Sequence, residues 1–264
     1  MPLFFTHIPR TAGTSFKKGF IFQNIAPEKI RRFEGVGSLV KDWRKPFDFL
    51  EGHYPYGIHH FCKCATPIIY VTTLREPLDR AVSYYHFIKQ CDTADYQHPD
   101  LGAVKRFDIA GFYRQPENQN LQTKFTAGFL ALTLTAFLPQ ALSGPLLLVQ
   151  AKYNLSQKYH LFGLVDRMSE FQEMAAKKLG WRNLRLWDNS NVTKNRPSID
   201  AISDAARTSI LGGNQLDLQL YGFAQKLFAE RMQDPGGQDE PILSKIGCPT
   251  RIRTRIIRAI RLRR

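Results

Sequence analysis

Short runs of apolar and β-branched residues alternate with longer segments of helical periodicity along most of the chain. Apolar runs of this length, without internal polar alternation, are typical of strands buried in a parallel sheet. The pattern predicts strands at Pro2–Thr6, Ile68–Leu74 and Tyr159–Val165. Residues 23–50 show no clear period, and we expect them to be irregular.

Helices are predicted between and after these strands. Pro77 favours a helix start because its restricted φ suits the first helical position. Ser169 and Gln172 have the spacing of a capping box, and Gly180 suits the end of the same helix. The predicted helices cover Thr14–Phe22, Pro77–Lys89, Ala151–Gln157, residues 169–180, Asp200–Leu211 and Gln215–Arg231.

The alternation of strands and helices, with few hairpin signals, favours an α/β fold. We expect a P-loop-like three-layer sandwich with a central parallel sheet flanked by helices. Residues 1–232 are predicted to form one catalytic domain, and residues 233–264 a linker and a basic C-terminal tail.

The segment from Phe125 to Gln150 contains no charged residue and is long enough to span a bilayer. Pro139 and the sequence Ser143-Gly144-Pro145 interrupt it, however. We therefore expect a buried helix, a turn and a second apolar element rather than a membrane span.

The formal net charge of +14 indicates an anionic partner. Residues 249–264 hold seven arginines and no acid, and the chain without them carries +7. Isoleucines lie between these arginines, so Arg251–Arg264 suits contact with a membrane surface or a polyanion. A solvated tail is the alternative. The four cysteines lack a matching His/Cys cluster, so we expect reduced thiols and no metal.

The segment from His7 to Phe16 follows a predicted strand and opens a predicted helix. Its small residues let backbone N–H groups approach an anion, and its hydroxyls and its arginine add donors and positive charge. The candidate phosphate ligands are Arg10, Thr11, Ala12, Gly13, Thr14 and Ser15. The G-x-x-x-x-G-K-[ST] loop of nucleoside triphosphatases is absent. A strand–turn–helix corner without a ligand is the alternative interpretation.

A second candidate for phosphate binding lies further along the chain. Arg75 comes at the end of a predicted strand, where open α/β sheets place their ligands. Ser83 lies two turns into the following helix. A guanidinium and a hydroxyl placed in this way can hold one phosphate together.

These motifs resemble those of the carbohydrate sulfotransferases. Pro9–Ser15, P-R-T-A-G-T-S, resembles the P-K-T-A-G-T-S loop that binds the 5′-phosphosulfate end of 3′-phosphoadenosine-5′-phosphosulfate (PAPS) in that family. Leu74–Tyr85 resembles its L-R-D-P-x-x-R-x-x-S-x-Y-Y element, which holds the 3′-phosphate. Ala151–Val165 is similar to the heparan sulfate 2-O-sulfotransferase branch and its bacterial relatives. Shorter matches are Glu51-Gly52-His53, Asn120–Thr123 and Asn191–Pro197.

The resemblance implies roles for individual residues. His53 aligns with the catalytic histidine and is the candidate general base, with Glu51 as a reserve base or as the group that orients His53. Arg10 stands where the family usually has lysine and would stabilise charge on the leaving phosphate. His7 is expected to be structural. The implied PAPS ligands outside the first loop are Arg75 and Ser83 for the 3′-phosphate, and Thr193, Lys194 and Arg196 in a covering loop.

The expected function is therefore in-line transfer of the sulfuryl group of PAPS to a hydroxyl of a carbohydrate acceptor, an oligosaccharide or glycan, with PAP as the product. Two alternatives stay open: a nucleotide kinase or NTPase, and a non-catalytic binder of anionic polymer or membrane through the basic tail. A cytoplasmic enzyme of bacterial type is expected, membrane-associated if the tail binds lipid. The Golgi lumen is expected instead if the sequence is a trimmed animal-type enzyme. Nothing in the sequence selects one acceptor or oligomeric state.

Overall fold

The computed structural model of the protein describes residues 1–35, 37, 46–61, 67–93, 96–183 and 196–233. Thr193, Lys194 and the basic tail lie outside the described residues. Within the described part, five parallel strands form one sheet in the order β2-β3-β1-β4-β5. The strands are β1 (Leu3–Thr6), β2 (Ile30–Arg32), β3 (Phe49–Gly52), β4 (Ile69–Leu74) and β5 (Leu161–Leu164).

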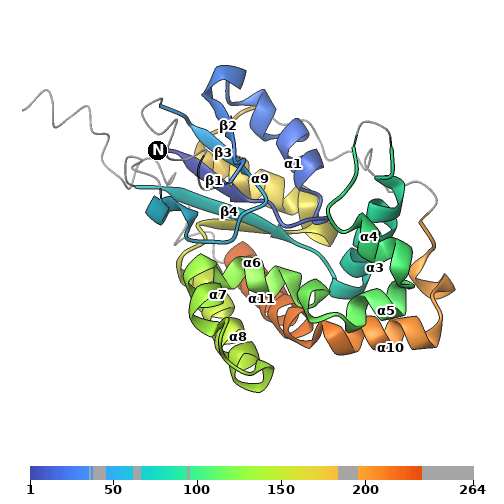
Figure 1. Ribbon diagram of the computed structural model, residues 1–264. Helices are drawn as coiled ribbons and strands as arrows, with labels where there is room; N and C mark the ends of the chain where they lie inside the picture. The colour runs from blue at the N-terminus through green and yellow to red at the C-terminus, as the bar shows by residue number, and fades with distance from the viewer. Residues whose placement is uncertain (36, 38–45, 62–66, 94–95, 184–195, 234–264) are drawn as a thin grey trace, which may run out of the picture.

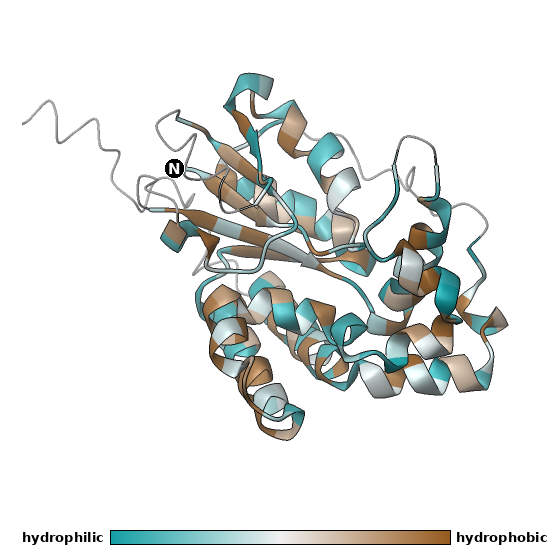
Figure 2. Cartoon of the chain, viewed as in Figure 1, coloured by the Kyte–Doolittle hydropathy of each residue, from teal (hydrophilic) through white to brown (hydrophobic). Residues whose placement is uncertain are grey.

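Helices cover both faces of this sheet (Figure 1). The helices α1 (Gly13–Gly19) and α9 (Met168–Leu179) lie on one face, where Phe16 of α1 packs against Phe5 of β1 with ring centroids 5.3 Å apart. On the other face lie α6 (Leu121–Ala127) and α11 (Gln215–Gln233). Apolar residues follow the strands between these layers (Figure 2). The predicted α/β fold with a parallel sheet between helices is confirmed.

A second group of helices lies beyond the carboxyl ends of the strands (Figure 1). Its buried apolar residues, among them Val82 and Phe112, form a cluster distinct from the main core. The predicted start of its first helix at Pro77 is confirmed, and the Glu76 carboxylate caps it by accepting hydrogen bonds from the N–H groups of Leu78 and Asp79. These helices are α3 (Pro77–Gln90), α4 (Leu101–Arg106), α5 (Ile109–Arg114) and α10 (Asp204–Gly213).

The strand order creates a crevice at one edge of the sheet. The chain runs from β1 outward to β2, returns to β3 beside β1, and then crosses to β4 on the other side of β1. Loops that follow neighbouring strands on opposite sides of such a switch point diverge and leave room for a ligand. The fold therefore directs the loops after β3, β1 and β4 towards a shared space.

The prediction of irregular structure over residues 23–50 is wrong at two strands. Ile30–Arg32 and Phe49–Gly52 each pair in parallel with a neighbour, although each has only three or four residues. Such short segments give too few positions for a period to be visible. Their pairing depends on the register with β1, which buries Phe49 and Leu50 completely.

The predicted capping box at Ser169 is also wrong. Helix α9 begins at Met168, its N-cap is Arg167, and no side chain caps it. Arg167 instead forms an ion pair with Glu170 in the first turn. The predicted end at Gly180 is confirmed: this glycine is the C-cap and has the left-handed φ of 66°.

The uncharged segment forms the end of α6, then α7 (Phe129–Thr135) and α8 (Gln140–Gln157). The expected break at Pro145 is wrong, because Pro145 lies inside α8, which continues through the helix predicted from Ala151. The expectation that the segment is buried is wrong for one face of each helix, where Leu134 and Val149 are exposed. In the part of the chain that the structure describes, no helix is long and apolar enough to cross a membrane.

Helices α6 and α11 cap each other's first turn. Asp217 of α11 is fully buried, and its carboxylate accepts hydrogen bonds from the backbone N–H groups of Gln122 (3.1 Å) and Thr123 (2.7 Å) and from the Thr123 hydroxyl (2.7 Å). In return, the side-chain oxygen of Asn120 accepts from the N–H groups of Leu216 and Asp217. This reciprocal arrangement satisfies donors that a helix start leaves without an intrahelical partner.

Replacing Asp217 by alanine leaves three buried donors without an acceptor, so we expect Asp217→Ala to lower the free energy of unfolding by about 3 kcal/mol or more. Urea denaturation measures the change. The control is Asp204→Ala in the first turn of α10, because Asp204 is exposed and its loss costs at most about 1 kcal/mol. Equal losses in the two variants would contradict the assigned role of the buried carboxylate.

Candidate active site at the carboxyl edge of the sheet

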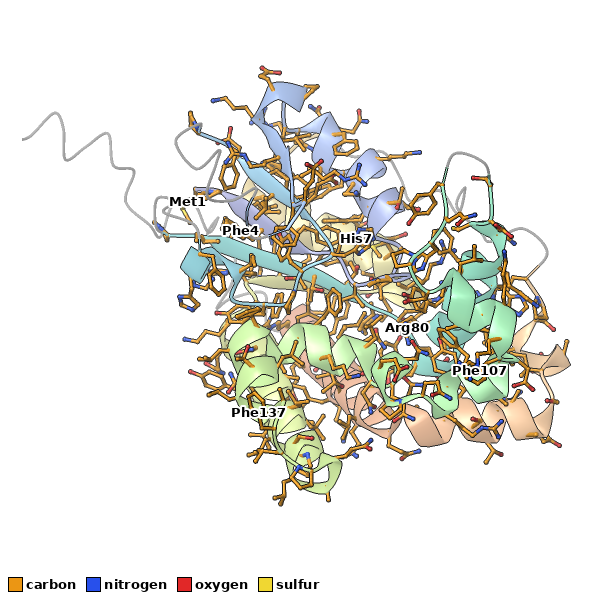
Figure 3. The ribbon with its side chains drawn as sticks, in the orientation of Figure 1. Met1, Phe4, His7, Arg80, Phe107 and Phe137 are labelled. Atoms are coloured by element: carbon orange, nitrogen blue, oxygen red, sulfur yellow. The ribbon has the colours of Figure 1, made fainter. Side chains whose placement is uncertain are left out.

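The loops after β3, β1 and β4 meet at a cavity of about 650 Å³. His53 follows β3, the loop from His7 to Ala12 follows β1, and Arg75 follows β4. Figure 3 shows His7 where β1 ends. Loops, α3 and the start of α6 complete the wall. Of the predicted site residues, the cavity is lined by Arg10, Ala12, Gly13, Thr14, Ser15, His53, Arg75, Ser83 and Arg196.

The loop after β1 has an unusual backbone. Arg10 and Ala12 both have left-handed φ values, 66° and 61°, which residues with a Cβ atom rarely adopt. Gly13 lies directly against the His7 imidazole, because a Cβ atom built there would be 2.1 Å from His7 Cδ2. The hydroxyl of Thr11 donates to the Ile8 carbonyl at 2.8 Å and contacts the Thr73 hydroxyl, so it supports the loop from beneath.

Positive charge gathers in one part of the cavity lining. Arg10 Nε donates a hydrogen bond to Ser83 Oγ at 3.0 Å, and the Arg10 guanidinium lies 4.7 Å above the centre of the Phe87 ring. Arg75 Nη1 donates to the carbonyl of Arg10 at 3.2 Å. The Asp79 carboxylate accepts from Arg75 Nε at 2.5 Å and from Arg196. The structure therefore brings together Arg10, Arg75, Ser83 and Arg196.

These guanidinium groups destabilise one another. Burial and the charges of Arg75 and Arg196 lower the pKa of Arg10 to about 10. Burial, with the charge of Arg80 added, lowers the pKa of Arg75, and burial with the charge of Arg75 lowers that of Arg196. All three stay charged near neutral pH. A local excess of partly buried cations is favourable only with an anion nearby, so this part of the cavity suits a phosphate or sulfate group.

Arg75 is held by its backbone as well as by its side chain. The side-chain amide of Gln122 accepts a hydrogen bond from the N–H of Arg75 and donates one to its carbonyl, both at 2.9 Å. Gln122 is buried at the start of α6, whose first turn Asp217 caps. The direction in which Arg75 leaves β4 is therefore set by the packed helical layer.

His53 also lines the cavity. Its Nδ1 lies 2.7 Å from the carbonyl oxygen of His7, and the two imidazole rings stack with centroids 4.5 Å apart. Because a carbonyl oxygen only accepts, Nδ1 must carry the hydrogen, and neutral His53 keeps the lone pair on Nε2. The side chain is exposed to the cavity, but partial burial of its ring by surrounding protein atoms lowers the pKa of His53. The charges of Lys17 and Arg32 lower this pKa further, whereas the hydrogen bond to the His7 carbonyl raises it.

Glu51 does not line the cavity. Its carboxylate forms an ion pair with Lys17 Nζ at 2.5 Å, and both side chains are mostly buried. His53 is oriented instead by the hydrogen bond that its Nδ1 donates to the His7 carbonyl. His7 lies beneath the loop, as expected from the sequence, but it also lines the cavity through its ring.

The sequence interpretation assigned no role to Asp79 or Gln122, although both lie within the matched motifs. The motifs L-R-E-P-L-D and N-L-Q-T mark the two residues as candidates, but a motif does not indicate which atoms its side chains contact. Thr11 and Glu51 lie outside the cavity lining. In the described part of the chain, no group of three or more His, Cys, Asp or Glu residues is placed to hold a metal ion.

The close contact between Gly13 and His7 predicts that a larger residue at position 13 lowers the stability of the protein. We expect Gly13→Ala to destabilise the protein by roughly 1–3 kcal/mol, because the new Cβ must displace His7 and its stack with His53. Gly102→Ala is the control. Gly102 lies inside α4, and a Cβ atom placed there would have nothing within 4 Å, so that change should stabilise the protein by about 0.5–1 kcal/mol. Thermal unfolding measures both, and a stabilised Gly13→Ala variant would contradict the close packing.

Comparison with known proteins shows similarity to sulfotransferases that act on heparan sulfate. The chain is 32% identical over 181 residues, 61% of its length, to a protein of Drosophila melanogaster named heparin sulfate O-sulfotransferase. It is 29% and 28% identical over 64% and 65% of its length to heparan sulfate 2-O-sulfotransferase 1 of Gallus gallus and Homo sapiens.

These matches cover 48–52% of the relatives, so the chain spans about half the length of the curated proteins it matches. No protein-family model matches the chain. The resemblance that the sequence motifs indicated is confirmed: over more than half of its length, the chain is similar to the heparan sulfate 2-O-sulfotransferases.

Proposed function

We propose that the protein is an O-sulfotransferase that uses PAPS as donor and a carbohydrate hydroxyl as acceptor. The observation that carries the proposal is the pairing, across one cavity, of a cluster of mutually repelling guanidinium groups with a histidine whose Nε2 is free to accept a proton. The first feature suits a polyanionic donor, and the second suits activation of a hydroxyl.

The residues of the cavity fit PAPS. Its phosphate groups would be held by Arg10, Arg75 and Arg196 with the Ser83 hydroxyl, whose oxygen lies within hydrogen-bond distance of Arg10. Gly13, Thr14 and Ser15 would add the N–H groups at the start of α1. The resemblance extends the proposed set to Thr193 and Lys194. When bound, PAPS supplies an activated sulfuryl group.

His53 is the proposed general base. The bond from Nδ1 to the His7 carbonyl fixes the tautomer and the direction of the ring, and the lowered pKa keeps the ring neutral near pH 7. Nε2 can then accept the proton of an acceptor hydroxyl as the oxygen attacks. Glu51 contributes indirectly, because it pairs with Lys17 and so limits the positive charge near His53. Arg10 is the proposed stabiliser of charge on the leaving phosphate.

A glycosaminoglycan is the proposed acceptor class. The named activities of the relatives are sulfation of heparan or heparin sulfate. Arg32 lines the same cavity as His53 and His98. A cation at this position suits an acidic sugar, while the Tyr84 hydroxyl, which donates to Asp100 at 2.7 Å, gives the wall a fixed polar surface.

Removal of the proposed base should stop turnover without removing the donor site. We expect His53→Ala to lower kcat by about 100-fold or more, while the affinity for PAP stays within about twofold of the wild type. Sulfuryl transfer to heparosan-type polysaccharide measures the first quantity, and calorimetry the second. His60→Ala is the control, because His60 is exposed and does not line the cavity. Near-normal turnover of His53→Ala would refute the assignment.

The same assignment sets a pH dependence. Only neutral His53 accepts a proton, and its pKa lies below the ordinary 6.5, so kcat/KM should fall on acidification only as the pH drops below about 6.5. A pH–rate profile measures the midpoint. A loss of activity centred above pH 7 would exclude this histidine as the titrating base.

The donor site is tested by binding. We expect calorimetry to show PAP binding that Arg75→Ala weakens by roughly 10- to 100-fold, with far less effect on 5′-AMP, because only PAP carries a 3′-phosphate. Arg106→Ala, an exposed arginine at the end of α4, should leave both affinities unchanged. Equal weakening of PAP and 5′-AMP would undo the role of Arg75. Strong ATP binding with no PAP binding would instead favour a nucleotide kinase.

A further inference from the structure

The helical hairpin of α7 and α8 presents an apolar face to solvent. Within the described residues, nine of the thirteen large apolar side chains that are exposed lie between Phe129 and Tyr153. Phe137, in the turn between the helices, is 92% exposed, and Leu134 and Val149 are 67% and 68% exposed. We define the hairpin face by six of these residues: Leu130, Leu134, Phe137, Leu142, Leu146 and Val149.

The hairpin face follows helical geometry. In α8, Leu142, Leu146 and Val149 are spaced by four and three residues and lie on one side of the helix. The opposite side, which includes Leu148 and Leu155, is buried in the main core. The exposure is therefore a property of one continuous surface and not of residues scattered around the helices.

The chain segment that forms the hairpin face contains no charged residue, and basic residues follow it in the sequence. From Phe125 to Ala151 the sequence contains no acidic or basic residue. Lys158, which follows α8, lies 5.6 Å from the centre of the Tyr153 ring, at the end of this stretch. An interface with another protein usually has a polar rim that includes charges. An apolar surface with no charge, next to a lysine, matches the hydrocarbon and headgroup layers of an anionic membrane.

The net charge of the whole chain also favours an anionic membrane as the partner of this face. A net charge of +14, with seven arginines and no acid in residues 249–264, attracts anionic lipid and repels a second copy of the chain. The hairpin face also lies away from the cavity: none of its residues lines it, and Figure 3 shows Phe137 well apart from His7.

We propose that the hairpin face of α7 and α8 docks onto the surface of a membrane that contains anionic phospholipid, with Phe137 and the leucines inserted at the level of the headgroups. The inference is independent of the proposed function. It concerns a surface outside the cavity, and it is tested without any transfer reaction.

The experiment is co-sedimentation of the full chain with vesicles of phosphatidylcholine and phosphatidylglycerol in equal parts, and with vesicles of phosphatidylcholine alone. We expect binding to the mixed vesicles, and weaker binding to the neutral ones. Phe137→Gln should reduce the partition coefficient by about tenfold, because an inserted aromatic side chain is lost. The double variant Leu134→Gln with Leu146→Gln should reduce it further.

Phe22→Gln is the matched control, since it makes the same substitution at an exposed phenylalanine outside the hairpin. It should leave the partition coefficient within about twofold of the wild type. Thermal unfolding and circular dichroism verify that each variant keeps its fold. Wild-type binding that both hairpin variants retain would overturn the proposal and place the contact elsewhere, as would the absence of wild-type binding. Self-association that Phe137→Gln abolishes, without vesicle binding, would assign the face to a second copy.

Discussion

The position of Arg75 depends on a series of buried hydrogen bonds that runs from α11 through α6 to the end of β4. Asp217 holds the first turn of α6, and the side-chain amide of Gln122 in that turn pairs with both backbone groups of Arg75. An amide that donates and accepts in this way acts as a short extension of the sheet. The charged edge of the cavity is therefore built on packed elements, although it is reached through loops.

This support matters because the edge carries more positive than negative charge. Burial lowers the pKa values of Arg10, Arg75 and Arg196, the charge of Arg75 adds to the shifts of the other two, and Asp79 accepts hydrogen bonds from Arg75 and Arg196. Cations brought together out of water repel more strongly than on an open surface. Hydrogen bonds to Ser83, to the Arg10 carbonyl and to Asp79 hold the guanidinium groups in place despite this repulsion, and a bound anion would relieve it. Ligand binding and folding stability are linked as a result.

The strands β1, β4 and β5 were predictable, because they coincide with apolar runs that are visible without any knowledge of neighbours. The strands β2 and β3 were not, since they exist through pairing with a strand distant in sequence. The exposed side of α8 was missed for a related reason. An apolar pattern shows that a residue favours burial, but not whether the fold has a partner for it.

In the candidate site, too, some features could be predicted from the sequence and others could not. Arg10, Arg75 and Ser83 could be placed together from their motifs, because a strand end and the next helix start have few geometric alternatives. The inward direction of the Thr11 hydroxyl and the pairing of Glu51 with Lys17 follow from side-chain rotation and from the loop backbone. Neither feature can be inferred from the order of residues along the chain.

The loop after β1 combines two residues in the left-handed region, Arg10 and Ala12, with a glycine that is not. Each left-handed residue with a Cβ costs about 1–2 kcal/mol, which the fold must offset elsewhere. Glycine at these positions would remove the cost but would also let the loop sample many shapes. The residues present keep the loop in one shape before a ligand arrives. An anion that binds this loop would then meet groups already in position, and less conformational entropy would be lost on binding.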